Sequence, residues 1–327
     1  MKRKRILSGM RPTGKLHLGH YLGVLENWVA LQGEYQNFHL IADYHVLTTS
    51  VDTSQIADST FEMVKDWLAA GIDPEQSPIF RQSQIKEHAE LFLILSMLIT
   101  AARLERNPTL KEQIRDLNVE NTTYGHLGYP VLQSADILLY KGELVPVGED
   151  QAPHVEISRE LARKFNRTYG EVFPEPQAKL NQFARLPGLD GQAKMSKSLN
   201  NAILISDTPD TIQTRLRKAV TDPQKIRKGD KGRPDVCLVY TYHTRFNKAR
   251  IPEIRSGCES GQLGCVDCKQ LCTQAIADHL APFRERREYF EDHPDEVWDV
   301  LQTGEVRAKS EAEKTMAEVR RAMRIGE

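Results

Sequence analysis

Residues 5–23 read RILSGMRPTGKLHLGHYLG, and this stretch indicates the fold more clearly than any other in the chain. Its apolar opening ends at Gly9, where a strand is expected to stop. The segment that follows is rich in glycine and contains Pro12, which indicates a tight loop, and the spacing of apolar residues after it is typical of a helix. A strand, a tight loop and a helix in this order predict the beginning of an α/β sheet.

Strand and helix signals alternate along the next part of the chain. Strand signals lie in residues 37–48, 77–83 and 143–151, and helical patterns lie in residues 54–71, 86–100, 129–140 and 154–166. Ser54 is expected to cap the first of these helices and Gly71 to follow its end. The alternation predicts a doubly wound parallel sheet of the Rossmann-like α/β type, with a polar insertion near residues 103–125.

The pattern changes after residue 200, where strand signals become rare and helical patterns dominate from Asp267 onward. We therefore expect a Rossmann-like domain at residues 1–204 and a second, mainly helical domain at residues 205–290. C-terminal helices at residues 291–327 are expected to pack back on the first domain.

Composition and charge exclude several classes of protein. Hydrophobic residues make up 40% of the 327 residues and charged residues 27%, so a large core can form. The net charge of −1 excludes a uniformly basic nucleic-acid coat, although residues 215–233 hold eight Lys or Arg against two Asp. No apolar run approaches the roughly 18 residues that span a membrane, and no apolar stretch follows the charged N-terminus as in a secretory signal. We expect a cytoplasmic protein.

Two histidines close the motif PTGKLHLGH at residues 12–20. His17 and His20 lie at the expected start of a helix, where free N–H groups and the positive end of the dipole favour an anion. Gly19 leaves room for a flat ring, such as a purine, against the backbone. Taken alone, the motif is equally compatible with a loop that carries two surface histidines.

Two lysines define a second motif, KMSKS at residues 194–198. Lys194 and Lys197, in a loop preceded by Gly188 and Gly191, form a cationic clamp suited to a triphosphate whose leaving pyrophosphate gains charge. A solvated basic loop is the alternative for this motif by itself. Together, in this order and about 175 residues apart, the two motifs are far more specific.

HLGH at 17–20 and KMSKS at 194–198 resemble the two signature motifs of class I aminoacyl-tRNA synthetases. Residues 8–23, 41–48, 129–140 and 145–166 further resemble the tryptophanyl members of that class. The resemblance implies ATP-dependent activation of L-tryptophan to tryptophanyl-adenylate, with Mg²⁺ on the phosphates, and transfer to tRNA(Trp). It also implies that the first domain is catalytic and the helical domain lies on the anticodon side. Such catalysis rests on positioning and charge stabilisation.

The resemblance carries specific roles onto matching positions. It implies catalytic roles for Lys194, Lys197, His17 and His20. It places ATP against Arg11, Thr13, Gly14, His17, Gly19, His20, Gly148, Asp150, Lys194, Met195, Ser196, Lys197 and Ser198. Lys111 falls where the family has a further phosphate-side lysine. Tryptophan is placed against Asp136, Tyr129, Gln133, His45 and Gln151.

Asp136 is the residue expected to recognise the tryptophan side chain. The indole N–H is the one hydrogen-bond donor of that side chain, and a buried carboxylate can accept it. Phenylalanine would leave the carboxylate unpaired, at a cost that reaches ~10⁴-fold or more in discrimination. The apolar neighbours Ala135 and Ile137 favour burial of Asp136 over a surface position.

Two positions depart from the tryptophanyl pattern. Arg11 and Gln133 stand where better-known tryptophanyl members carry Gln and Met, and tyrosyl members use a glutamine like Gln133. A tyrosyl-tRNA synthetase is therefore an alternative. A second alternative is an inactive synthetase-like tRNA-binding protein, which the intact HLGH and KMSKS motifs disfavour.

All five cysteines lie in residues 237–272. Cys237, Cys258, Cys265 and Cys268 are spaced C-x20-C-x6-C-x2-C, and four such thiolates can hold zinc or an iron–sulfur cluster. Some tryptophanyl members are similar here and carry a [4Fe–4S] cluster, which the resemblance implies, with zinc as the alternative and chance clustering as the third possibility. Cys272 is expected to be a bystander.

The resemblance also implies partners. The family works as a symmetric dimer, so we expect a homodimer. The basic run at 215–233 is expected to contact tRNA phosphates, which contribute affinity without reading sequence; a solvated surface is the alternative.

Overall fold

The centre of the molecule is a five-stranded sheet with the strand order β3-β2-β1-β4-β5. The computed structural model describes residues 3–116, 122–148, 151–180, 186–227 and 229–326. All neighbouring strands run parallel. The strands are β1 (Arg5–Met10), β2 (Gln36–Ile41), β3 (Ile79–Arg81), β4 (Leu144–Val147) and β5 (Gln177–Leu180). The chain winds outward from β1 in both directions, so the prediction of a doubly wound parallel sheet is confirmed.

Helices cover the sheet and build a second lobe. Their bounds are α1 (Leu18–His20), α2 (Glu26–Leu31), α3 (Ile56–Ala70), α4 (Glu87–Ser96), α5 (Ala101–Glu105), α6 (Pro108–Asp116), α7 (Tyr124–Leu139), α8 (Ala152–Tyr169), α9 (Pro209–Arg217), α10 (Leu238–Phe246), α11 (Ile251–Ser260), α12 (Cys265–Asp292) and α13 (Pro294–Met323). A π-helical turn, Tyr21–Leu25, joins α1 to α2, and short 3-10 turns lie at Tyr44–Val46, Gln82–Gln84, Pro234–Val236 and Lys248–Arg250.

Alternate residues of the strands pack into two different cores, as side chains on opposite faces of a sheet must. Leu40 and Phe80 pack with the buried residues of α4, α7 and α8. Ile41 and Ile79 pack with Trp67 of α3, in a core that continues into α9, α10 and α12. The helical lobe therefore shares a core with one face of the sheet.

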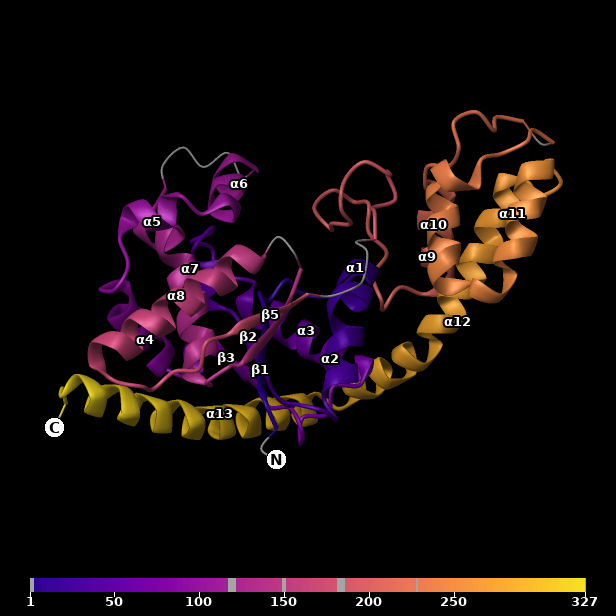
Figure 1. Cartoon of the computed structure of the whole chain (residues 1–327). Helices are drawn as coiled ribbons and strands as arrows, with labels where there is room; N and C mark the ends of the chain where they lie inside the picture. The colour runs from indigo at the N-terminus through magenta and orange to yellow at the C-terminus, as the bar shows by residue number, and fades with distance from the viewer. Residues whose placement is uncertain (1–2, 117–121, 149–150, 181–185, 228, 327) are drawn as a thin grey trace.

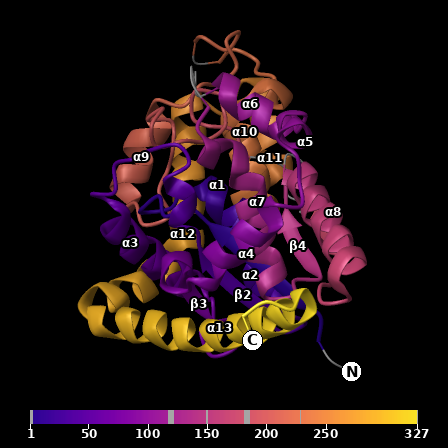
Figure 2. The same ribbon diagram turned by 90° about the vertical axis from the view of Figure 1, so that its left-hand side faces the viewer.

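The two longest helices follow one another, one between the helical lobe and the sheet and the other beneath the sheet domain (Figure 1). α12 leads from the helical lobe back to the sheet, and α13 then passes along the edge of the molecule beside β3 (Figure 2). A Cβ added to Gly304 of α13 would lie 1.9 Å from the carbonyl oxygen of Ile79, so only glycine allows this approach. Arg5 of β1 also pairs with Glu311 of α13 at 2.6 Å.

Three local expectations can be compared with the structure. α3 ends at Gly71, which adopts a φ of 107° as predicted, but its N-cap position is Gln55 and not Ser54, whose N–H is bound by Asp52. The strand β5 was not expected, because the sequence QAKL lacks an apolar alternation; in the structure its residues are largely exposed. The stretch 103–125 contains parts of α5 and α7 and the whole of α6, with Leu104 and Leu110 buried.

None of the helices within the described residues is long and apolar enough to cross a membrane.

Candidate active site

The predicted site residues gather where the strands end. Arg11 follows β1, His45 follows β2, Gln82 follows β3 and Gly148 follows β4. Because the carboxyl ends of parallel strands meet at one edge of the sheet, these loops face the same side of the molecule. The strand order reverses between β1 and β4, and ligands of such folds bind at this switch point.

The first motif is a tight loop whose backbone is fixed on both sides. Gly14 turns the chain with a φ of 71°, a conformation that L side chains rarely adopt. The N–H of Leu16 donates to the Asp66 carboxylate at 2.6 Å, and the carbonyl of Leu16 accepts from the Ile205 N–H at 3.0 Å. His17 then caps α1, its Nδ1 accepting from the N–H of His20 at 3.3 Å.

The rings of His17 and His20 are stacked, with their centroids 3.7 Å apart and their planes inclined by 19°. Burial, helped by the charge of Lys197, lowers the pKa of His17 to about 4. Burial, helped by His17 and both motif lysines, lowers the pKa of His20 to about 3. Both imidazoles are therefore neutral at pH 7, and each can donate one N–H to an acceptor. Within the described residues, Nδ1 of His20 is buried and has no hydrogen-bond partner.

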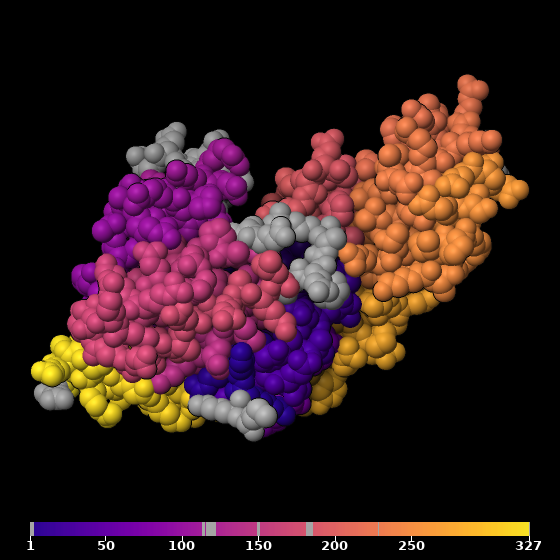
Figure 3. All heavy atoms as spheres, viewed as in Figure 1, coloured from indigo at the N-terminus to yellow at the C-terminus, as the bar shows by residue number. Residues whose placement is uncertain are grey.

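The second motif lies directly against the first. The ammonium of Lys197 donates to the carbonyl oxygen of Thr13 and to that of Lys15, the latter at 2.9 Å. Gly19 leaves room for the His17 ring, from which a Cβ at this position would lie 3.0 Å away, and it faces Cβ of Met195 at an ordinary contact distance of 3.6 Å. Figure 3 shows the segment that contains the second motif standing on the surface between the two lobes.

The remaining residues of the second motif are held from within the loop. Asn201, which is 3% exposed, accepts from the Ser196 N–H at 2.7 Å and donates to Asp190 at 2.8 Å. The hydroxyls of Ser196 and Ser198 lie 2.9 Å apart, and Lys194 is exposed. Sequence reasoning did not single out Asn201, because an asparagine after a basic loop carries no signal of its own.

Asp136 is buried on α7 and accepts three hydrogen bonds. Nε2 of His45 lies 3.0 Å from Oδ2, while Nδ1 of His88 and the amide of Gln82 each lie 2.7 Å from Oδ1. Burial by itself would raise the pKa of Asp136, but the bonds from His45 and His88 outweigh it and lower the pKa to about 2. The carboxylate is therefore ionised at neutral pH. The burial predicted from its apolar neighbours is confirmed.

The sequence pointed to neither His88 nor Gln82, which come from α4 and from the end of β3. Nε2 of His88 lies 2.9 Å from the hydroxyl of Tyr140, so the ring bridges Asp136 and Tyr140. The signal that could have found His88 is a lone histidine in an otherwise apolar helix, which more often marks a core residue.

A second chain of contacts adjoins Asp136. The hydroxyl of Tyr129 lies 2.8 Å from Nε2 of His154, whose Nδ1 lies 3.1 Å from the side-chain oxygen of Gln151. The rings of His45 and Tyr129 meet edge to face with their centroids 6.3 Å apart. The structure thus joins four of the five residues assigned to tryptophan, and the fifth, Gln133, is half-buried on the same helix as Tyr129.

The other assigned residues lie around this region. Arg11 is exposed and donates to Thr49 and, at 3.4 Å, to the carbonyl of Val46, so it contacts the loop that follows His45. Gly148 accepts from the N–H of Gln151 at 3.0 Å. Asp150 lies outside the described residues. Lys111 is exposed on α6.

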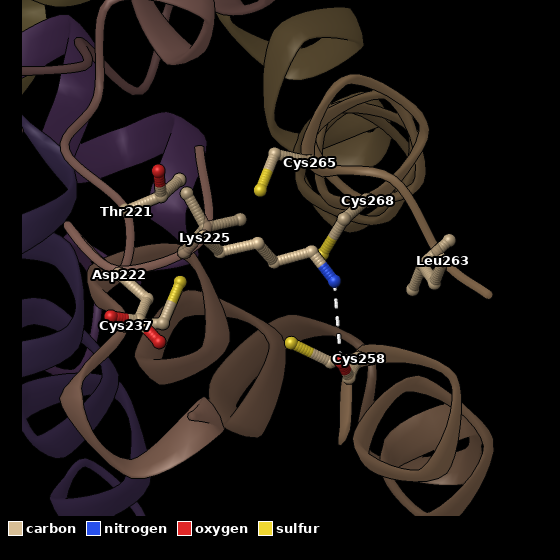
Figure 4. A pocket seen from close by; sticks show the side chains of 9 residues that line it. Thr221, Asp222, Lys225, Cys237, Cys258, Leu263, Cys265 and Cys268 are labelled. Carbon is tan, nitrogen blue, oxygen red and sulfur yellow. Dashed lines mark hydrogen bonds between the residues drawn. The ribbon is translucent and has the colours of Figure 1, made fainter. Parts of the chain in front are cut away.

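The four spaced cysteines line one pocket of the helical lobe, together with Lys225 and neighbouring side chains. Figure 4 shows the sulfurs of Cys237, Cys258, Cys265 and Cys268 around a common space, into which the chain of Lys225 extends. The ammonium of Lys225 donates to the carbonyl oxygen of Cys258 at 3.2 Å.

All five cysteines are free thiols. Cys272 is fully buried in the core and is not one of the residues that line this pocket. In the described part of the chain, no three or more His, Cys, Asp or Glu side chains are arranged to hold a single metal ion. The four sulfurs thus share a pocket without being gathered at the spacing of a mononuclear site.

Comparison with known proteins agrees with this fold and site. Residues 1–281 match the family model of tRNA synthetases class I (W and Y). A tryptophan–tRNA ligase of Thermotoga maritima is 48% identical over 326 residues, covering 98% of this chain and 99% of the relative. One of Aquifex aeolicus is 43% identical, covering 98% and 100%. The crystal structure of tryptophanyl-tRNA synthetase from Campylobacter jejuni, complexed with ADP and tryptophan, superposes with a TM-score of 0.89 at 32% identity, covering 98% and 100%.

The fold and the two motifs define a class I aminoacyl-tRNA synthetase. Within that class, the chain belongs to the tryptophan–tRNA ligase family. The tyrosyl alternative and the inactive alternative are therefore wrong, since relatives that match over the whole chain are tryptophan–tRNA ligases.

Proposed function

We propose that this chain activates L-tryptophan with ATP and transfers it to tRNA(Trp). In the first step, a carboxylate oxygen of tryptophan attacks the α-phosphorus of ATP. The bond to the bridging oxygen breaks, and pyrophosphate leaves with the electron pair. In the second step, a hydroxyl of the terminal ribose of the tRNA attacks the carbonyl carbon, AMP leaves, and the hydroxyl proton is released. No protein nucleophile is needed.

The observation that carries this proposal is the contact between the two motifs. Lys197 lies against the Thr13–Lys15 backbone, beside the neutral, stacked rings of His17 and His20. The imidazoles would donate hydrogen bonds to phosphate oxygens. The lysines would supply the positive charge that stabilises the departing pyrophosphate, where charge develops in the transition state. Mg²⁺ bound to the phosphates would neutralise further charge.

Asp136 is proposed to accept the indole N–H. A carboxylate has about four sites for hydrogen-bond donors. His88 and Gln82 occupy Oδ1, while among the described residues Oδ2 is contacted by His45 alone, so Oδ2 keeps capacity for one more donor. The low pKa of Asp136 keeps this acceptor charged, which strengthens the bond to a neutral N–H. Tyr129, Gln133, His45 and Gln151 would complete the pocket around the substrate.

The cysteine pocket is proposed to hold a [4Fe–4S] cluster. A cubane cluster binds each thiolate through a different iron, so it spreads its ligands more widely than zinc, which gathers four sulfurs around one ion. The four cysteine sulfurs that line one pocket supply the number of thiolates that such a cluster would need. When bound, the cluster would supply a cross-link among α10, α11 and α12. Zinc bound by the same four cysteines is the alternative to the cluster.

The helical lobe, about residues 205–290, is proposed to contact the anticodon side of the tRNA, and residues 1–204 to form the catalytic domain. Arg215 and Arg233 of the basic run are paired with Asp207 and Asp222. Among the described residues of this run, the exposed charges that can meet tRNA phosphates are Arg217, Lys218, Arg227 and Lys231. We propose that the reaction takes place in the cytoplasm, where translation uses the charged tRNA.

A homodimer is proposed from one apolar surface. Leu93, Met97 and Tyr124 are 56%, 74% and 69% exposed, and they lie on or next to α4 and α7, which pack against each other. A contiguous apolar patch on a surface often marks an interface, and we propose that these three side chains belong to one such patch.

The activity is tested by exchange of labelled pyrophosphate into ATP, measured with each of the amino acids in turn. Exchange that depends on tryptophan is the expected result. Exchange with none of them, or with tyrosine in its place, would overturn the proposal.

A further inference from the structure

A buried carboxylate outside both motifs holds the backbone of the first motif. Asp66, on α3, is fully buried, and its Oδ2 accepts the N–H of Leu16 at 2.6 Å. The carbonyl of Leu16 is bound by the N–H of Ile205, just beyond the second motif. The peptide groups on both sides of Leu16 are thus fixed, and His17 follows directly.

The other oxygen of this carboxylate is held from the helical lobe. Nη1 of Arg287, on α12, donates to Oδ1 of Asp66, and the Arg287 side chain is 3% exposed. The same guanidinium donates to the side chain of Glu62 and, at 3.2 Å, to the Glu62 carbonyl. Burial raises the pKa of Asp66 to about 6 although Arg287 opposes it, so the carboxylate is mostly ionised at neutral pH.

A second, weaker contact joins the same elements. Lys15 of the first motif lies 3.8 Å from Glu62, whose carboxylate is also held by Arg287. Two neighbouring acidic residues of α3 therefore connect one arginine of α12 to two consecutive residues of the loop. α12 begins at Cys265 in the cysteine pocket and carries Arg287 near its other end.

We propose that Asp66 and Arg287 are positioning residues for ATP. Through the Leu16 N–H they fix the loop of residues 12–20, and they make its position depend on how α12 is seated against α3. Neither side chain touches the reacting atoms. The inference rests on the proposed function, because it takes this loop to bind ATP.

The test compares isosteric carboxylate-to-amide variants in tryptophan-dependent pyrophosphate exchange. Asp66→Asn keeps the shape of the side chain but removes the charge that holds Arg287. We expect the KM for ATP to rise roughly tenfold to a hundredfold, the loss of one charged hydrogen bond, while the KM for tryptophan stays within about twofold. Glu311→Gln, which removes the pair with Arg5 far from the loop, is the control and should leave both constants unchanged.

A second pair of variants separates positioning from general destabilisation. Arg287→Met should raise the KM for ATP as Asp66→Asn does, and the double variant should show little further change, because the two residues act as one unit. Arg287→Lys should recover part of the affinity. If Asp66→Asn does not fold, the KM for ATP is compared between Arg287→Lys and Arg287→Met. A lower KM in Arg287→Lys supports the positioning role, and equal values contradict it.

The outcomes are distinct. Equal changes in the KM for ATP and for tryptophan, or a lower melting temperature with unchanged constants, would overturn the positioning role. Absence of tryptophan-dependent exchange in the unmodified chain would overturn the proposed function itself.

Discussion

The ammonium of Lys197 donates a hydrogen bond to the carbonyl oxygen of Lys15, 2.9 Å away in space and 182 residues away in sequence. A second bond, to Thr13, fixes the same ammonium over the turn that precedes His17. A lysine bound only to neutral carbonyls can exchange them for phosphate oxygens, which are stronger acceptors because they are charged. The contact therefore marks where pyrophosphate is expected to lie.

Replacing Asp136 by Asn tests how the side chain of tryptophan is recognised. The substitution keeps the size of the group but removes the charged acceptor proposed for the indole N–H. We expect the KM for tryptophan to rise roughly tenfold to a hundredfold, with the KM for ATP unchanged. Pyrophosphate exchange measures both constants. Asp278→Asn, at an exposed position on α12, is the matched control.

Because Asp136 also anchors His45, Gln82 and His88, the variant will be less stable, and its melting temperature must be recorded beside the kinetics. An unchanged KM for tryptophan in the folded variant would show that another residue reads the indole.

The stability of the fold should depend on the neutral form of His20. Its pKa is 6.5 in the reference state and about 3 in the folded protein, so the unfolded chain binds the proton more readily. The contribution of His20 to stability is therefore complete above pH 6.5 and is lost as the pH falls from 6.5 toward 3. When the pH is lowered from 7 to 4.5, the unfolding free energy of both proteins should fall. The fall should be about 1 to 2 kcal/mol smaller in His20→Gln than in the unmodified chain.

Urea denaturation at each pH measures this difference. Asp66, whose pKa is raised to about 6, acts in the opposite direction, since its stabilising protonation grows as the pH falls below 6. That effect is common to both proteins and cancels in the comparison. His293→Gln, at an exposed position, is the control. Parallel pH curves for His20→Gln and the unmodified chain would contradict the neutral, buried imidazole.

Gly232 offers a direct test of the cysteine pocket. A Cβ at this position would lie 2.6 Å from the sulfur of Cys258 and 2.9 Å from Cδ of Lys225. Gly232→Ala should displace the sulfur and lower the cluster content of anaerobically purified protein, from about four irons per chain to less than half of that. Visible absorption and iron analysis report the loss.

Gly33→Ala is the matched control, because a Cβ there meets no atom within 4 Å. Tryptophan-dependent exchange should persist in Gly232→Ala, since the pocket lies in the helical lobe and the adenylation step needs no electron transfer. If the unmodified protein is colourless and contains one zinc per chain, the cluster proposal is wrong and the pocket is a structural zinc site. No metal at all would leave the cysteines without this role.

The dimer is tested at its proposed apolar surface. Leu93→Asp combined with Met97→Asp places two carboxylates at positions that are 56% and 74% exposed. Sedimentation should then give a single chain of 37.2 kDa, whereas the unmodified protein sediments at about twice that mass. Val306→Asp, at an exposed apolar position of α13, is the control. An unmodified protein that sediments as a single chain at micromolar concentration would refute the dimer.

The two motifs and the sheet could be predicted because each depends on local sequence. Glycines at turns, apolar runs in strands and helical spacing are all readable without knowing which segments meet. β5 shows the limit of this reading. Its four residues are mostly exposed, and they form a strand because β4 presents an edge for pairing, which the sequence QAKL does not reveal.

The partners of the predicted site residues could not be predicted either, because the sequence does not show which segments meet in the fold. Asp136 was assigned from the family resemblance, and its apolar neighbours predicted its burial. His88 reaches it through the packing of α4 on α7, and Gln82 reaches it from the turn that follows β3. Asp66 and Arg287 are 221 residues apart, and nothing in either segment indicates the other.

The most direct test of the account is the rate of tryptophanyl-adenylate formation in a single turnover, measured for the unmodified chain and for Lys197→Met. The lysine is expected to act mainly on the charge of departing pyrophosphate, so the rate should fall by roughly 10² to 10³ while the KM for tryptophan changes little. Lys309→Met, on an exposed face of α13, should leave the rate unchanged. A variant with a normal rate of adenylate formation and weakened tryptophan binding would contradict the central claim that this lysine works in the transition state.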